Sequence, residues 1–242
     1  MQELVDFIAR YRPEYPATVA GASAAEIAAL EEAAGRSLPA DYRDFLRVFG
    51  RSAGEPKPFA MQFDTALDEV LRFFRKSRWK PPPPFLLIGR DRSGSDMDLC
   101  LDLDAAEPRV VLFQRWWEPG EPMRLSVVYQ SLPQMLFSQS FLSVRLPLLP
   151  HQATFVSGAA AWDEARNGTR LGILAAIGRE LELPLVPHAA GWAPCYDAGE
   201  IALAAYQPEG SGLFLQVGAA DGARLALLER ILVRRLQLVR SA

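Results

Sequence analysis

Two short amphipathic helices in tandem, joined by a tight turn, are the feature of this sequence that most restricts its fold. They lie in the segment GASAAEIAALEEAAGRSLPADYRDFLRVFG, residues 21–50. Ser23 and Glu26 have the spacing of a capping box, and Gly35 is suited to end the helix that begins there. Pro39 suits the first turn of the second helix. The apolar face of this second helix is formed by Tyr42, Phe45, Leu46 and Phe49. The segment predicts an antiparallel helix pair whose aromatic face is covered by another part of a globular domain.

Four apolar segments further along the chain have the length and the flanking turns of β-strands. They are residues 85–89, 99–103, 109–113 and 125–129. Their short, turn-rich connections favour an antiparallel meander. Apolar residues at helical spacing predict further helices over residues 2–11, 64–78 and 131–143. This order predicts an α+β fold in which helices pack on a mostly antiparallel sheet.

Two prolines, Pro147 and Pro150, predict a domain boundary. We therefore expect one domain over residues 1–146 and a second, small α+β domain of unknown type over residues 147–242. The second domain contains two predicted helices, residues 170–182 and 225–236, and a predicted hairpin made of residues 201–206 and 213–217.

The order of these pieces resembles the SUKH superfamily, the Smi-Knr-like proteins, over residues 1–146. The matching helical positions are Leu38, Pro39, Tyr42, Phe45, Leu46 and Gly50, and the matching strand positions are Ile88, Gly89, Gly94, Leu101, Asp102 and Val110. The resemblance implies a SUKH-like α+β fold. For bacterial members it implies an immunity protein that binds and neutralises a toxin, and for eukaryotic members a scaffold or regulatory subunit. The matching residues are core and turn positions without chemistry of their own. The chain departs from the family pattern at residues 51–60 and in the turn DRSGSDMD, where surface loops set the choice of partner.

Composition excludes several classes of protein. The 242 residues carry a net charge of −3, which argues against a general affinity for nucleic acid. The first residues lack the basic start of a signal peptide, and no window approaches 18 uninterrupted apolar residues. We therefore expect a cytoplasmic protein that does not enter a membrane. No cofactor motif is present in the sequence.

Few residues are candidates for catalysis. The histidines are His151 and His188, and the cysteines are Cys100 and Cys195. His188 lies near Cys195 and Asp197 in the sequence, but nearness in sequence does not establish the geometry of a Cys–His pair. Metal-ligand spacings such as CxxC and HExxH are absent, so we expect neither a metal site nor a disulfide framework.

An acidic segment is the first candidate for a binding surface. Between Asp91 and Glu107 six acidic residues face one arginine, which gives a local charge of −5. Four of the acidic residues share parity and would point to one face of a continuous strand: Asp96, Asp98, Asp102 and Asp104. They form either a solvated sheet face or an acidic patch that docks on a basic toxin.

Aromatic and basic residues give two further candidates. Trp116 and Trp117 precede the loop EPGEP; either they belong to the core or, if exposed, they are interface anchors. The basic residues between Arg72 and Lys80 surround Trp79. They suggest either contacts to nucleic acid or, more simply, the exposed face of a helix.

We conclude from the sequence that the chain is a non-enzymatic binding protein whose partner is another protein, such as a toxin domain. The predicted contact residues are Asp96, Asp98, Asp102 and Asp104, followed by Trp116 and Trp117. One alternative is a scaffold or regulatory subunit of a larger assembly. The other is a small enzyme that uses a cleft between the two domains, with His188 or Cys195 in it.

Overall fold

The computed structural model describes residues 1–55, 57, 62–158 and 169–241. The chain folds as two compact units, Met1–Gln139 and Ser140–Ala242. The division falls within a continuous helical stretch that precedes Pro147 and Pro150. The predicted α+β class is confirmed, because both units combine helices with an antiparallel sheet.

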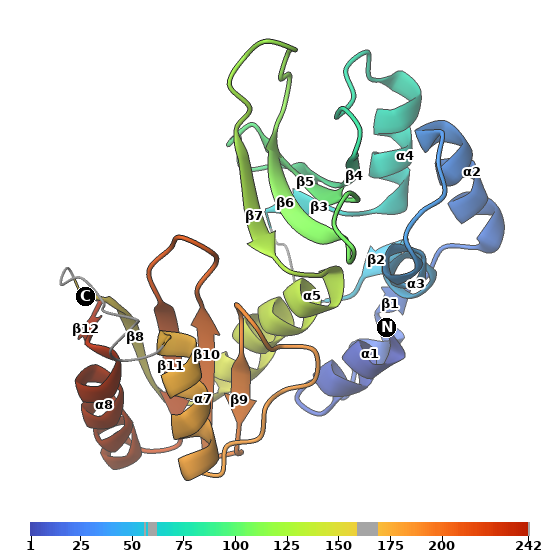
Figure 1. Cartoon of the computed structure of the whole chain (residues 1–242). Helices are drawn as coiled ribbons and strands as arrows, with labels where there is room; N and C mark the ends of the chain where they lie inside the picture. Colours follow the sequence, from blue (N-terminus) through green and yellow to red (C-terminus); the bar gives the residue numbers. More distant parts are fainter. Residues whose placement is uncertain (56, 58–61, 159–168, 242) are drawn as a thin grey trace. The chain divides into compact units, whose positions relative to one another are not determined.

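The first unit begins with helices and three very short strands (Figure 1). The elements are α1 (Gln2–Ala9), η1 (Tyr15–Ala17), β1 (Val19–Ala20), α2 (Ala24–Ala34), α3 (Ala40–Phe49), β2 (Ser52–Ala53), β3 (Phe63–Asp64) and α4 (Leu67–Lys76). The capping box of Ser23 and Glu26 starts α2, and Gly35 ends it with a left-handed backbone at φ 68°. Pro39 is the N-cap of α3 and therefore lies just before the first turn, not inside it. Helix α2 packs mainly against α4 and only slightly against α3, so the expected α2–α3 pair is a minor contact.

A five-stranded antiparallel sheet follows, in the order β3-β4-β5-β6-β7. Its main strands are β4 (Phe85–Asp91), β5 (Met97–Asp102), β6 (Arg109–Gln114) and β7 (Leu125–Tyr129). The predicted meander is therefore confirmed. Strand β5 is the central strand and is buried at every position after Met97. The chain then enters α5 (Leu132–Ser140), a π-helical turn (η2, Phe141–Arg145) and a short 3-10 helix (η3, Leu146–Leu148).

The second unit contains another five-stranded antiparallel sheet, in the order β12-β8-β11-β10-β9. Its elements are β8 (His151–Ser157), α7 (Arg170–Glu180), β9 (Cys195–Asp197), β10 (Ile201–Tyr206), β11 (Phe214–Ala219), α8 (Gly222–Leu236) and β12 (Leu238–Arg240). Alternate residues of the sheet, such as Phe155 and Leu215, share one apolar core with Leu174 of α7 and Leu228 of α8. The two helices and the β10–β11 hairpin agree with the sequence, whereas β8, β9 and β12 were not predicted.

Packing beneath this second sheet is close. A Cβ atom on Gly218 would lie 2.7 Å from Cδ1 of Leu149, so only glycine fits here without a shift. Arg145 is buried and donates a forked pair of hydrogen bonds to Asp197, with Nε 3.0 Å and Nη2 2.9 Å from Oδ1. This ion pair joins the helical stretch to β9 within the same unit.

Candidate functional site

Strand β5 carries two of the four aspartates that the sequence placed on an acidic surface. Asp98 and Asp102 do share a face, as their parity predicted, but Asp98 is 0% exposed and Asp102 is 5% exposed. The expectation of an exposed acidic strand face is therefore wrong. The physical reason is that both faces of β5 are covered, since consecutive residues from Asp98 to Asp102 are all buried and do not alternate with exposed ones.

Asp98 is the centre of a buried polar cluster. Its carboxylate accepts two hydrogen bonds from Arg115, at 2.7 Å from Nη2 and 3.2 Å from Nε. It also accepts the backbone N–H of Asp91 at 2.9 Å and lies 3.4 Å from Nε of Arg90. Arg90 in turn lies over the ring of Phe73, 5.0 Å from its centroid. The hydrogen bonds to Asp98 raise the pKa of the Arg115 guanidinium above its ordinary value.

Asp102 and Asp104 lie at the other end of β5. Asp102 forms a 2.6 Å ion pair with Arg109 of β6 and accepts the backbone N–H of Asp104 at 3.2 Å. Asp104 is exposed beyond the end of the strand. Asp96 is also exposed but precedes the start of β5. The structure therefore does not bring the four aspartates together: two are buried, and the two exposed ones lie at opposite ends of the strand.

The turn between β4 and β5 is organised by Asp91. Its carboxylate accepts hydrogen bonds from the backbone N–H of Ser93 at 2.8 Å, from Oγ of Ser93 at 2.6 Å and from the backbone N–H of Ser95 at 2.7 Å. Desolvation opposes the ionised form, but the hydrogen bonds prevail and lower the pKa of Asp91 to about 2. The turn ends at Asp96, which has a left-handed backbone with φ 57°.

The two tryptophans have different environments. Trp117 is partly buried: it packs edge-on against Phe113, and its Nε1 donates to the carbonyl oxygen of Glu121 at 3.0 Å. Trp116 is 59% exposed, and its backbone is left-handed with φ 62°. Its ring packs against the ring of Trp79, with 5.9 Å between the ring centroids. The exposed alternative describes Trp116, whereas Trp117 is neither a core residue nor fully exposed.

Further exposed apolar side chains follow Trp116 in the chain. Among the described residues of the first unit, three large apolar side chains are exposed, and all three lie between β6 and the start of β7: Trp116 (59%), Met123 (41%) and Leu125 (37%). Exposed carboxylates flank them at Asp96, Glu118 and Glu121. We call these six residues the hairpin surface; the connection that carries most of them runs between β6 and β7 at one end of the sheet (Figure 1).

Sequence reasoning missed Met123 and Leu125. Their spacing of two residues is the pattern of a strand with one apolar face, and Leu125 lies directly opposite Phe113 in the sheet. Phe113 is buried whereas Leu125 is exposed, so the pattern by itself did not indicate which side chains reach solvent.

The basic run around Trp79 covers the last turns of α4 and the segment that follows its end at Lys76. Arg72 pairs with Glu69 one turn earlier, and Nζ of Lys80 donates to the carbonyl oxygen of Phe74 while lying over its ring. Trp79 packs between Phe73 of α4 and Phe113 of β6. Its ring is therefore part of the packing beneath Trp116 and is not a free platform for a nucleic-acid base.

The residues suspected of catalysis differ in their exposure to solvent. Cys195 is buried, with its Sγ 3.8 Å from the carbonyl oxygen of Ala193, whereas His188 is exposed on a turn with φ 59°. Cys100 is also buried, and desolvation raises the pKa of its thiol well above the ordinary value. Over the described parts of the chain, no group of three or more His, Cys, Asp and Glu side chains could hold a metal ion.

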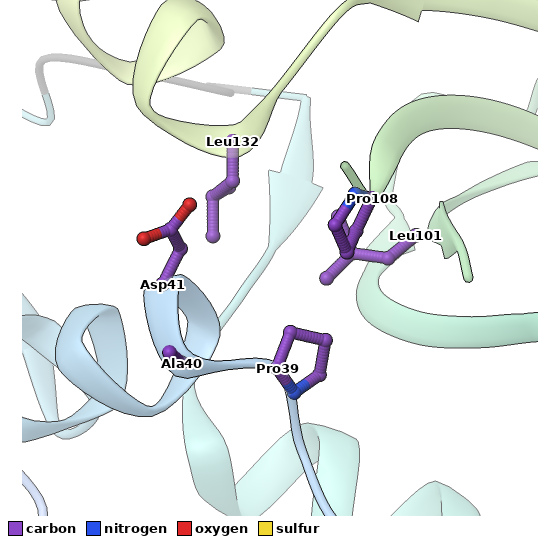
Figure 2. Close-up of a pocket in the computed structure, with 6 residues that line it drawn as sticks. All are labelled: Pro39, Ala40, Asp41, Leu101, Pro108 and Leu132. Atoms are coloured by element: carbon purple, nitrogen blue, oxygen red, sulfur yellow. The ribbon is translucent and has the colours of Figure 1, made fainter. Parts of the chain in front are cut away.

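A small hollow in the first unit lies between the start of α3, the sheet and the start of α5 (Figure 2). Its volume is about 150 Å³, and it is lined by Pro39, Ala40, Asp41, Leu101, Pro108 and Leu132. Asp41 supplies the one ionisable side chain of this lining. A single exposed carboxylate does not provide the paired acid and base of a hydrolytic site.

Comparison with known proteins gives one family. The model of the SMI1 / KNR4 family (SUKH-1) matches residues 21–138. This range includes α2 to β7 and most of α5, and with them the whole hairpin surface. No curated protein and no solved structure matches the chain. None of the helices described in the structure is long and apolar enough to cross a membrane.

Proposed function

We propose that this chain, whose residues 21–138 match the model of the SMI1 / KNR4 family (SUKH-1), is a non-enzymatic immunity protein that binds and neutralises a toxin in the cytoplasm. The observation that carries the proposal is the concentration of exposed large apolar side chains on the hairpin surface. Keeping such groups in water is unfavourable, and exposed apolar patches rimmed by polar groups mark interaction sites.

Trp116 is the proposed anchor of the interface. Tryptophan is enriched among residues that contribute most to binding, because its large rigid ring buries much surface at little entropic cost. The ring is 59% exposed in the free protein and is backed by Trp79, so it is already ordered before a partner arrives. A pre-ordered anchor reduces the entropy lost on binding.

The charge of the hairpin surface favours a basic partner. Asp96, Glu118 and Glu121 are exposed at its rim, against one exposed arginine, Arg124, between Met123 and Leu125. Rim charges increase the rate of association with a surface of opposite sign. Asp104 lies beyond the far end of β5 and would contribute only through the long-range field. Asp98 and Asp102 act inside the sheet and do not touch the partner in this proposal.

Neutralisation would be steric. Trp116, Met123 and Leu125 would fill a concave apolar site on the toxin, while the acidic rim pairs with basic groups around it. A protein that occupies the concave active-site region of a toxin blocks substrate access without chemistry of its own.

The test is capture of partners from the source cells with wild-type protein and with Trp116→Ala, followed by affinity measurement and by a growth assay in cells that express the captured protein. We expect wild-type protein to rescue growth and Trp116→Ala to bind at least about 30-fold more weakly, since an interface anchor contributes about 2 kcal/mol or more. Leu148→Ala is the matched control, because Leu148 is an exposed apolar residue of the second unit. Equal affinity of Trp116→Ala and wild type would refute the surface assignment. A stable partner that is not toxic would instead support the scaffold alternative.

A further inference from the structure

The carboxylate of Asp98 accepts hydrogen bonds from residues on both sides of its strand. From β4 it receives the backbone N–H of Asp91, and from the end of β6 it receives the guanidinium of Arg115. The carboxylate is completely buried, and burying a charge is unfavourable unless it is paired and hydrogen-bonded. A buried ion pair adds little net stability compared with apolar side chains of the same size. A charged residue in the central strand therefore points to a role other than net stability.

Arg115 extends this cluster to both turns at this end of the sheet. Its backbone N–H donates to the carbonyl oxygen of Asp96 at 2.8 Å, and its Nη2 donates to that of Asp91 at 3.3 Å. Nη1 also lies 3.7 Å from the carboxylate of Asp96. Through these contacts, Arg115 links the β4–β5 turn to the start of the β6–β7 connection. The next residue is Trp116, whose left-handed backbone at φ 62° is unfavourable for a bulky residue and needs support from its surroundings.

We propose that Asp98 is a positioning residue: by fixing Arg115, it holds Asp96 and Trp116 in one ordered hairpin surface. The role of that surface in binding rests on the proposed function, whereas the ordering of the surface does not. Asp98 thus acts on the surface from within the sheet, without contact to a partner.

The chain offers a matched control in Asp102. It lies on the same strand and the same face as Asp98, is also buried, and also pairs with an arginine of β6, Arg109. Its ion pair, however, lies at the end of β5 away from Trp116. Asp98→Asn and Asp102→Asn each remove one buried negative charge. Because the side chain of Arg109 is 41% exposed and that of Arg115 is 14% exposed, the free energy of unfolding of both variants is measured as well, and the loss in global stability is subtracted before exchange rates are compared.

The experiment is native-state amide exchange of the free protein, followed by NMR. The reporting amides are those of Arg115, bonded to the Asp96 carbonyl at 2.8 Å, and Gln114, bonded to the Arg124 carbonyl at 3.1 Å. We expect both amides to exchange at least tenfold faster in Asp98→Asn and to keep their wild-type rates in Asp102→Asn. Wild-type rates in Asp98→Asn, or an equal increase in both variants, would overturn the proposal.

Two additions keep the test decisive. If Asp98→Asn does not fold because Arg115 is left without its counter-charge, the double change Asp98→Leu with Arg115→Met removes both charges, and the Gln114 amide remains the reporter with the same expectation. Affinity for a partner found as described above is measured separately. A rise in exchange without any partner supports positioning and counts against the proposed function, whereas unchanged exchange overturns positioning whether or not a partner binds.

Discussion

Replacing Tyr42 by phenylalanine should stabilise the first unit, whereas the same replacement at Tyr15 should destabilise it. Both side chains are 0% exposed, and the two changes remove the same hydroxyl group. The hydroxyl of Tyr15 donates a 2.7 Å hydrogen bond to the carbonyl oxygen of Ala53. The hydroxyl of Tyr42 is buried without a hydrogen-bond partner among the residues that the structure describes. The environment of the hydroxyl, and not the size of the change, therefore decides the sign.

The magnitudes follow from the cost of unpaired polar groups. A buried hydroxyl without a partner costs about 1–3 kcal/mol, so Tyr42→Phe should raise the free energy of unfolding by about 1 kcal/mol after allowance for the small cavity. Tyr15→Phe loses a hydrogen bond and leaves the Ala53 carbonyl unpaired, so it should lower that free energy by about 1–2 kcal/mol. The free energies of unfolding of the two variants should then differ by about 2–3 kcal/mol, which corresponds to roughly 4–12 °C in melting temperature for a unit of this size.

The assay is urea unfolding at neutral pH, followed by far-UV circular dichroism. Both residues belong to the first unit, so both changes should move the same transition. A loss of 0.5 kcal/mol or more in Tyr42→Phe would refute the reasoning, because it would show that the hydroxyl has a partner. Desolvation raises the pKa of both phenols, so neither should titrate near pH 10, which ultraviolet absorbance can check.

Three further predictions concern single sites. Although desolvation opposes ionisation, hydrogen bonds hold the pKa of Asp91 at about 2, below its value in the unfolded chain. Its contribution to stability should therefore be complete above about pH 4 and fade as the pH falls toward 2, so the stability difference between wild type and Asp91→Asn should shrink between pH 6 and pH 3 in urea titrations. Asp197→Asn should destabilise the second unit by about 3 kcal/mol in urea unfolding, because it removes the charge of one member of the buried Arg145–Asp197 ion pair; a loss below 1 kcal/mol would contradict this. Gly218→Ala places a Cβ atom 2.7 Å from Leu149 and should cost about 1–3 kcal/mol, measured as a lower melting temperature; an unchanged melting temperature would show that Leu149 moves freely.

Much of the fold was predictable because its elements are encoded locally. The capping box of Ser23 and Glu26 and the stop at Gly35 involve residues a few positions apart, and the structure places α2 between them. The four strands of the main meander were predicted from short apolar runs with turns between them. The short strands β1, β2 and β3 were missed, since two residues are too few to show a period.

The candidate site was predicted only in part. The sequence drew attention to Trp116 and Asp96, and both are exposed on the hairpin surface. It also selected Asp98 and Asp102, which the structure places inside the sheet. Alternation along a strand indicates which residues share a face, but it cannot indicate whether that face meets solvent or another layer of the protein.

By itself, the sequence determined the order of helices and strands, the caps that bound α2, and the α+β class, because these depend on neighbouring residues. The tertiary structure decided which carboxylates are buried and which tryptophan is exposed. Asp98 meets Arg115 across 17 positions of sequence, and Trp79 meets Trp117 across 38. Burial arises from such long-range contacts, since a side chain leaves water only when distant segments close over it.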